Sequence, residues 1–159
     1  LLVEHESAML ASPETAMLES TAAEGIGELL VTTLTNPYLP LLRYEIGDFV
    51  ERTPAGYRVH GRKRDALRGA DGRILTTRMI DQAFTGIGGI AHYQLRQKAD
   101  GSAHLFLLPE AKGDSLTSAQ AKLTTELSRL LGITVTAGSV SLIAPEDSGK
   151  VRLTVREAA

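Results

Sequence analysis

The hydrophobic and polar positions follow different patterns in the two parts of the chain. Up to about residue 62, short runs rich in Val, Thr, Leu and Tyr are separated by Gly and Pro, as in SAMLA, AMLES, ELLVTTL, LLRYEI, DFVERT and YRVHG. Such runs favour β-strands, and no long helical period interrupts them. Because short strands without a covering helix are hard to stabilise alone, we expect this part to be the edge of a larger β structure.

After about residue 62 the pattern also predicts two helices. The stronger helix covers residues 115–132, and Gly132 ends it. Its leucines recur at helical spacing and form one stripe, at Leu116, Leu123, Leu127 and Leu130. The weaker helix is TTRMIDQAF, in which Thr76 or Thr77 can serve as N-cap.

Strands are expected around these helices, in the order β-α-β-β-α-β. They fall at residues 73–75, 91–98, 103–109 and 139–145. Asp100-Gly101, between the middle two strands, is a strong hairpin signal. This order is typical of a ferredoxin-like sheet with two helices on one face. We therefore predict an α+β protein with a β subdomain at 1–62, a ferredoxin-like domain at 63–159 and a hinge near 62–65.

Composition and charge exclude several classes of function. The net charge is −2 and no Lys/Arg run is present, so the sequence predicts no nucleic-acid partner. No apolar run is long enough to span a bilayer, so no membrane association is expected. The absence of cysteine fits a cytoplasmic location, and the four histidines lack metal-ligand spacing, so no metal site is expected. Residue 1 is Leu rather than Met, so we expect the sequence to be a piece of a longer protein.

Three short stretches could contribute functional residues, and each also has a purely structural interpretation. Gly47-Asp48 is either a β-turn or a carboxylate held to bind a vicinal diol such as a ribose. The stretch HGRKRDALRGADG, with Arg62, is either a solvated basic turn or an arginine aimed at a sugar or phosphate. Lys150 follows Ser-Gly but lacks the Walker A glycine and hydroxyl residue, so it is a surface lysine or reaches a partner elsewhere.

Together, and in this order, the three stretches resemble the adenylate-forming (AMP-binding) superfamily of acyl-CoA synthetases. GELLVTTLTNPYLPLLRYEIGD, GRKRDALRGADGRILTTRMID and PEDSGKVRL are similar to motifs of its C-terminal portion, in the phenylacetate-CoA ligase-like branch. The similarity covers nearly the whole chain from about Gly25. It implies that residues 1–62 are the last β subdomain of a large N-terminal domain and that residues 63–159 form a small mobile lid.

The resemblance also implies roles for individual residues. Asp48 would hold the ribose hydroxyls of ATP or AMP, and Arg62 would contact the nucleotide. Arg64 occupies the pivot position of the hinge. Gly72 belongs to a loop that swings toward the thioester-forming site, and Lys150 would bridge the carboxylate and the α-phosphate during adenylation.

The implied activity is ATP-dependent activation of a carboxylic acid, aryl by analogy with the branch, followed by thioester formation with CoA. ATP with Mg²⁺ and CoA would bind only with the missing N-terminal domain, so this chain alone should be inactive. A second hypothesis is a non-catalytic small-ligand-binding or regulatory α+β module that dimerises, since fold does not fix function. A third is an interaction protein that forms a homodimer through an exposed β edge.

Overall fold

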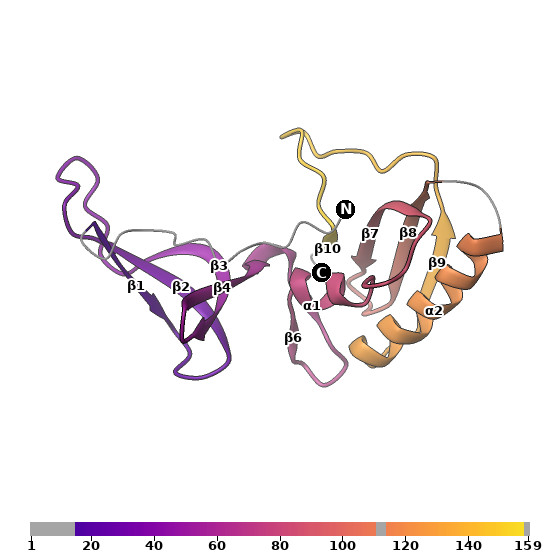
Figure 1. Cartoon of the computed structure of the whole chain (residues 1–159), viewed down its shortest axis with the longest axis horizontal. Helices are drawn as coiled ribbons and strands as arrows, with labels where there is room; N and C mark the ends of the chain where they lie inside the picture. Colours follow the sequence, from indigo (N-terminus) through magenta and orange to yellow (C-terminus); the bar gives the residue numbers. More distant parts are fainter. Residues whose placement is uncertain (1–14, 111–113, 158–159) are drawn as a thin grey trace. The chain divides into compact units, whose positions relative to one another are not determined.

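The computed structural model describes residues 15–110 and 114–157 and divides into two compact units. The first unit is Leu1–Lys63 and the second is Arg64–Ala159. The first unit contains strands β1 to β4, and the second contains strands β5 to β10 with helices α1 and α2 (Figure 1). A short 3₁₀ helix, Lys63–Asp65, lies at the division. That this stretch acts as a hinge stays a prediction.

The first unit is a four-stranded antiparallel sheet in the order β1-β2-β3-β4. The strands are β1 (Ala16–Ser20), β2 (Ile26–Thr33), β3 (Tyr44–Thr53) and β4 (Gly56–Arg62). Its core is small and apolar, with Leu29, Leu30, Phe49 and Val50 buried. The strand-rich character predicted for this part is confirmed, while the expected strand at 7–11 lies outside the described residues.

Strand β3 differs from the two strands that the sequence predicts on either side of Gly47-Asp48. It runs without interruption through both residues. Gly47 has φ +83°, which glycine adopts without steric cost, and the register with β2 shifts between Glu28 and Leu30. The chain therefore bulges at Gly47 instead of turning back, and the β-turn interpretation of Gly47-Asp48 is wrong.

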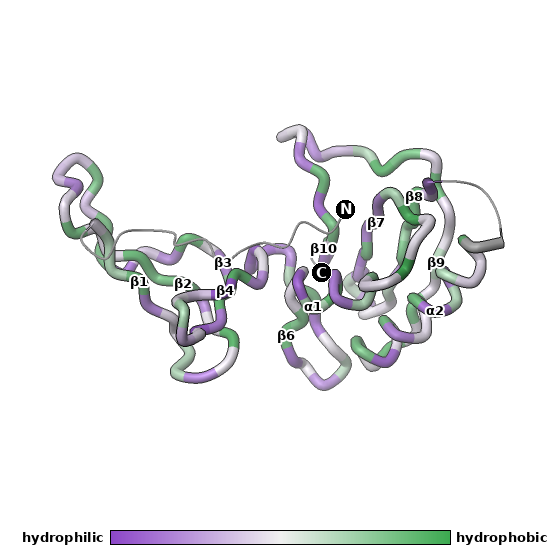
Figure 2. Tube along the Cα trace, in the orientation of Figure 1, coloured by the Kyte–Doolittle hydropathy of each residue, from purple (hydrophilic) through white to green (hydrophobic). Residues whose placement is uncertain are grey.

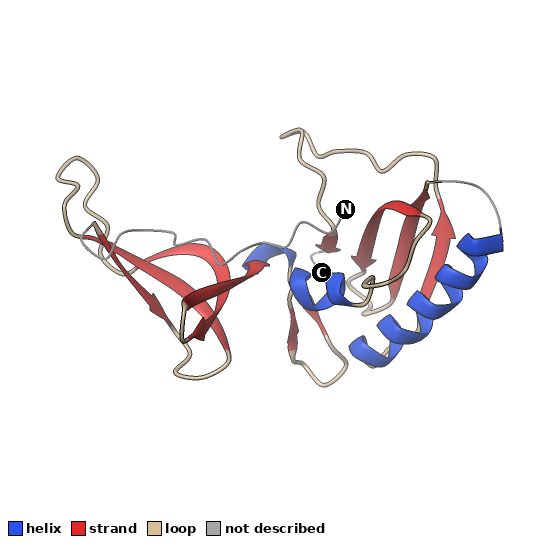
Figure 3. Ribbon diagram, in the orientation of Figure 1, coloured by secondary structure: helices blue, strands red, loops and turns tan. Residues whose placement is uncertain are grey.

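The main sheet of the second unit has the strand order β10-β7-β8-β9 (Figure 3). An antiparallel hairpin of β7 (Ile90–Gln97) and β8 (Ala103–Pro109) forms its centre. β9 (Val135–Ser139) pairs parallel to β8, and β10 (Thr154–Arg156) pairs parallel to β7. The hairpin turn predicted at Asp100-Gly101 is confirmed.

Helices α1 (Thr77–Gln82) and α2 (Asp114–Leu131) pack on one face of this sheet, as the sequence predicts. Thr76 is the N-cap of α1 and accepts a hydrogen bond from the Met79 amide at 3.4 Å. Hydrophobic positions recur along α2 between hydrophilic ones (Figure 2). One buried core joins the helices to the sheet through Ile80, Leu95, Leu105, Leu123 and Leu127. No helix in the described ranges is long and apolar enough to cross a membrane.

The ferredoxin-like pairing of this sheet is not confirmed, although the unit is α+β. The strand expected at 73–75 is β6 (Ile74–Leu75), which pairs with β5 (Leu67–Arg68) in a separate two-stranded hairpin. A ferredoxin-like sheet needs that first strand among its four. Here the short strand β10 completes the sheet instead, beside β7.

The strand expected at 139–145 is also misplaced. The strand that follows α2 is β9, which ends at Ser139. Val135 at its start is buried against the core, whereas residues 141–145 form a loop in which only Ile143 is buried. Burial of Val135 beside Ala103 therefore sets the register, and the apolar letters after Ser139 do not extend the strand.

Candidate functional site

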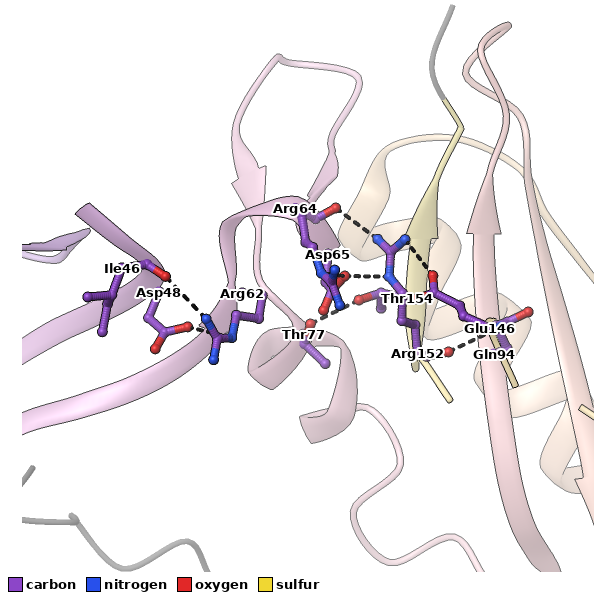
Figure 4. A network of polar contacts seen from close by, with 10 residues as sticks. All are labelled: Ile46, Asp48, Arg62, Arg64, Asp65, Thr77, Gln94, Glu146, Arg152 and Thr154. Carbon is purple, nitrogen blue, oxygen red and sulfur yellow. Dashed lines mark hydrogen bonds and ion pairs between the residues drawn. The ribbon is translucent and has the colours of Figure 1, made fainter. Parts of the chain in front are cut away.

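Asp48 and Arg62 form an ion pair across strands β3 and β4. The two residues are cross-strand partners, and Arg62 Nε lies 2.9 Å from Asp48 Oδ1. Arg62 Nη1 donates to the Ile46 carbonyl at 3.1 Å, which holds the guanidinium along the strand (Figure 4). The Asp48 side chain is 16% exposed and that of Arg62 is 57% exposed. The arrangement presents an oriented carboxylate and a guanidinium at the surface of the first unit.

Two bulges flank this pair. The first is the Gly47 bulge against β2, and the second lies between Phe49 and Val50, where the register with β4 shifts. Gly61, opposite Phe49, has φ +111°. Bulges change the direction of side chains relative to a regular strand, so these two bulges help to set the directions of the Asp48 and Arg62 side chains.

Lys150 ends a tight turn that we call the lysine loop, residues 146–150. The Glu146 amide donates to the Lys150 carbonyl at 2.9 Å, and the Gly149 amide donates to the Glu146 carbonyl at 2.7 Å. Gly149 has φ +78°, a value that favours glycine. Lys150 itself is exposed, and its ammonium makes no ion pair with any residue in the described part of the chain. The backbone of the loop is therefore fixed while its cation is available.

Arg152 braces the lysine loop and was missed by sequence reasoning. Its Nε lies 2.5 Å from Asp65 Oδ1, its Nη1 lies 3.1 Å from Glu146 Oε1, and its Nη2 donates to the Arg64 carbonyl at 2.9 Å (Figure 4). The Arg152 and Asp65 side chains are each 16% exposed. One guanidinium thus joins the start of the second unit to the loop that carries the lysine. Asp65 and Arg152 are 87 positions apart, and no local sequence signal links them.

Arg64 and Gly72 lie elsewhere in the second unit. The Arg64 side chain is 60% exposed, with Nε 3.6 Å from Asp65 Oδ1. Gly72 lies in the turn of the β5–β6 hairpin with φ +81°, and its amide donates to the Gly69 carbonyl at 2.9 Å. Its carbonyl accepts a hydrogen bond from Arg68 Nη1 at 3.1 Å. Of the predicted site residues, the structure pairs Asp48 with Arg62 and links Arg64 to the lysine loop through Arg152.

Two histidines of the described residues contact other side chains. His60 is buried, with Nε2 3.2 Å from Glu51 Oε2, and hydrogen bonds from His60 and Arg58 lower the pKa of Glu51. His104 Nδ1 lies 2.7 Å from Thr136 Oγ1. No group of three or more potential metal ligands occurs among the described residues.

Known proteins resemble this chain in fold. No family model matches the sequence, and no curated protein matches it significantly. A 2-hydroxyisobutyryl-CoA ligase, solved in the postadenylation state with 2-HIB-AMP, matches 91% of this chain with a TM-score of 0.68 and 17% identity. Over the matched residues the fold is that of part of an acyl-CoA ligase. An anthranilate-CoA ligase with anthranoyl-AMP matches 87% with a TM-score of 0.64 and 15% identity.

A third ligase-fold structure is o-succinylbenzoate-CoA synthetase from Bacillus subtilis, with its acyl-adenylate intermediate. It matches 87% of the chain with a TM-score of 0.63 and 13% identity. The chain spans 36% of the first structure, 31% of the second and 33% of the third. It therefore has the fold of about a third of such a ligase.

Proposed function

We propose that this chain is the C-terminal part of an AMP-forming acid–CoA ligase and supplies a mobile lid with a catalytic lysine. The observation that carries the proposal is the lysine loop. Its backbone is fixed by its own hydrogen bonds and by Arg152, while the Lys150 ammonium is exposed without an ion-pair partner in the described residues. The similarity of fold to acyl-CoA ligases supports the reaction class.

The chemistry explains why such a cation is needed. In adenylation, an anionic carboxylate attacks an anionic α-phosphate, and the two groups repel each other. Lys150 places its ammonium between them and stabilises the charge that develops on the phosphoryl oxygens. A compact ammonium on a flexible stem suits this task, and a mobile lid lets it withdraw before the thiol attacks.

In this proposal the first unit binds the nucleotide. Asp48 accepts hydrogen bonds from the two ribose hydroxyls of ATP or AMP, and Arg62 holds the Asp48 carboxylate in position while contacting the nucleotide. The oriented ion pair fits this role because a diol needs a carboxylate whose direction is fixed. ATP, bound with Mg²⁺, supplies the adenylyl group and pyrophosphate as leaving group.

In this proposal the second unit takes part in both half-reactions, adenylation and thioester formation. Arg64 is the pivot about which the lid rotates, and Arg152 keeps the lysine loop attached to the neighbouring Asp65. Gly72, in the β5–β6 turn, faces the thioester-forming site after rotation and admits the CoA thiol. Because the pivot and the lysine loop share one guanidinium, Lys150 moves together with the pivot segment rather than on a loose loop.

The exposed apolar surface of the first unit supports a larger protein. Leu34 is 56% exposed, Tyr38 96%, Leu39 58% and Leu42 82%. Hydrophobic patches on a soluble protein mark contact surfaces. In this proposal the patch packs against the rest of a large N-terminal domain, of which the first unit is the last β subdomain. The acyl pocket and most ATP contacts belong to that domain, so this chain alone is inactive.

The finer assignments are predictions that rest on the sequence motifs. These are the phenylacetate-CoA ligase-like branch, an aryl acid as substrate and a cytoplasmic location. Homodimerisation through the β edge is likewise a prediction. A panel of aromatic and aliphatic acids, assayed by pyrophosphate exchange with the longer protein, identifies the acid.

The decisive experiment separates the two half-reactions in the longer enzyme. Lys150→Ala should slow pyrophosphate exchange by about 10²- to 10³-fold, because one preorganised charge at the transition state is lost. Thioester formation from supplied acyl-adenylate should stay unchanged. Lys122→Ala, an exposed lysine on α2, is the matched control and should change neither rate. Normal exchange in Lys150→Ala, or equal loss in both half-reactions, would contradict the assignment.

A further inference from the structure

A cavity in the second unit gathers four cations, and three of them, Arg68, Lys98 and Arg156, have no role in the proposed reaction. Its volume is about 440 Å³, within the range of pockets that hold small ligands. Basic side chains line it from the start of the unit, from β5, from the β7–β8 loop and from the end of β10. The residues that define this basic pocket are Arg64, Arg68, Gln97, Lys98, Arg156 and Glu157.

The positive charge of the basic pocket is not balanced locally. Four cationic side chains face one lining carboxylate, that of Glu157, although the chain as a whole has a formal charge of −2. Lys98 and Arg156 make no ion pair within the described ranges, and Arg68 Nη1 donates only to a backbone carbonyl, that of Gly72. A concave site lined by one sign of charge concentrates ions of the opposite sign.

The positive charge of the Arg64 guanidinium is not fully neutralised either. Its Nε lies 3.6 Å from Asp65 Oδ1, but the same oxygen is 2.5 Å from Arg152 Nε. The nearer guanidinium therefore takes most of the Asp65 charge. Asp100, on the β7–β8 loop, does not line the pocket; two hydrogen bonds from Ser102 lower its pKa, and the charge of Lys98 lowers it further.

The floor of the basic pocket is rigid. Gln97 is 5% exposed and exchanges two hydrogen bonds with the Arg68 backbone, at 2.9 Å to its Oε1 and 2.7 Å from its Nε2. The Glu157 amide donates to the Gln97 carbonyl at 2.9 Å. These bonds fix the spacing between β5, which carries Arg68, the end of β7 next to Lys98, and the end of β10, which carries Arg156. The cations are thus held near one another despite their repulsion.

The geometry points to a binding site for a ligand that carries two or more phosphate groups. Guanidinium groups match phosphate oxygens in pairs, and several fixed cations favour a polyanion over a single carboxylate. Inorganic pyrophosphate, a nucleoside triphosphate and the phosphorylated part of CoA share this chemistry. The site is independent of Asp48 and Lys150, so it stands or falls separately from the proposed function.

Calorimetric titration of the 159-residue chain with inorganic pyrophosphate tests the site. Lys98→Gln combined with Arg156→Gln should weaken binding at least about tenfold, because two charge-assisted contacts are lost. The matched control, Lys122→Gln with Arg129→Gln on α2, removes the same charge elsewhere in the unit and should change affinity less than about twofold. All four side chains are exposed, so both variants should fold, as circular dichroism will show.

Further titrations distinguish the ligand sources. Inorganic phosphate should bind more weakly than pyrophosphate, since it engages fewer cations. Equal affinity for pyrophosphate, ATP and CoA would support recognition of phosphate groups alone, whereas a clear preference for ATP or CoA would support the site and identify its ligand. No detectable pyrophosphate binding by the unaltered chain, or an equal loss in the control variant, would overturn the assignment.

Discussion

Removing the Arg152 guanidinium should destabilise the second unit and loosen the lysine loop. Arg152→Met keeps most of the aliphatic stem but deletes the contacts to Asp65, Glu146 and the Arg64 carbonyl. Among the described residues, it leaves the Asp65 carboxylate, which is 16% exposed, with the Arg64 guanidinium at 3.6 Å as its one ion-pair partner. The loss therefore includes both the bonds and the cost of an undercompensated carboxylate.

The burial of the pair sets the size of the effect. Exposed ion pairs contribute about 0–1 kcal/mol, and breaking a fully buried pair costs about 3–5 kcal/mol. With both side chains 16% exposed, Arg152→Met should cost about 2 kcal/mol. A double-mutant cycle with Asp65→Asn should give a coupling of about 1 kcal/mol, because Asp65 is one of three partners.

Urea unfolding followed by far-ultraviolet circular dichroism measures this cost. Both described α-helices belong to the second unit, so the helical signal reports on that unit. Hydrogen exchange adds a local measure: the Glu146 and Gly149 amides, which close the lysine loop, should exchange faster in Arg152→Met. Arg129→Met is the control, because its pair with Glu126 is well exposed, and it should leave the transition unchanged. A coupling near zero, or unchanged exchange at both amides, would refute the bracing role.

Two further predictions concern the free energy of unfolding. Gly47→Ala should lower it by about 1 kcal/mol, because φ is +83° but no atom lies within 4 Å of the added Cβ. Gly27→Ala should lower it by at least about 2 kcal/mol, since its Cβ would lie 2.4 Å from the Ala22 nitrogen; urea unfolding measures both changes. Burial raises the pKa of Tyr93, so above the unfolded pKa of 10.0 the unfolded chain loses the phenol proton while the folded state keeps it. The unfolding free energy should therefore fall as the pH rises beyond that value, by up to about 1.4 kcal/mol per pH unit. Tyr93→Phe should remove that component of the slope, and an identical slope in the variant would contradict the buried phenol.

Local signals in the sequence predicted the local elements. The leucine stripe predicted α2, Gly132 its end, Thr76 the N-cap of α1 and Asp100-Gly101 the hairpin, because each depends on neighbours within a few positions. The candidate residues Asp48 and Arg62 were also found in the sequence, and they proved to be cross-strand partners. That pairing follows from β3 and β4 forming a hairpin, which is itself a local arrangement.

Features that depend on distant contacts could not be predicted. A glycine before an aspartate is equally compatible with a turn and a bulge, and only the register with β2 decides that Gly47 is a bulge. The placement of β10 beside β7 depends on pairing across more than fifty positions, since Thr154 lies opposite Leu95. The same holds for Arg152 and Asp65: charged residues are common in both stretches, and nothing local selects this pair.

Under the proposed function, the segment from Lys150 to Arg152 has to meet two different requirements. A fixed brace requires several bonds in defined directions, which the planar guanidinium of Arg152 provides to two carboxylates and a carbonyl. The cation of the proposed reaction instead requires a flexible stem, and Lys150 is exposed with no ion-pair partner among the described residues. Since only Val151 separates them, the brace fixes the backbone from which the lysine extends. Exchanging the two residue types should therefore impair both the brace and the proposed reaction. A lysine ammonium carries its three donors on one nitrogen and does not bridge separated oxygens as the planar guanidinium does, while an arginine at 150 presents a fork that pairs with carboxylates.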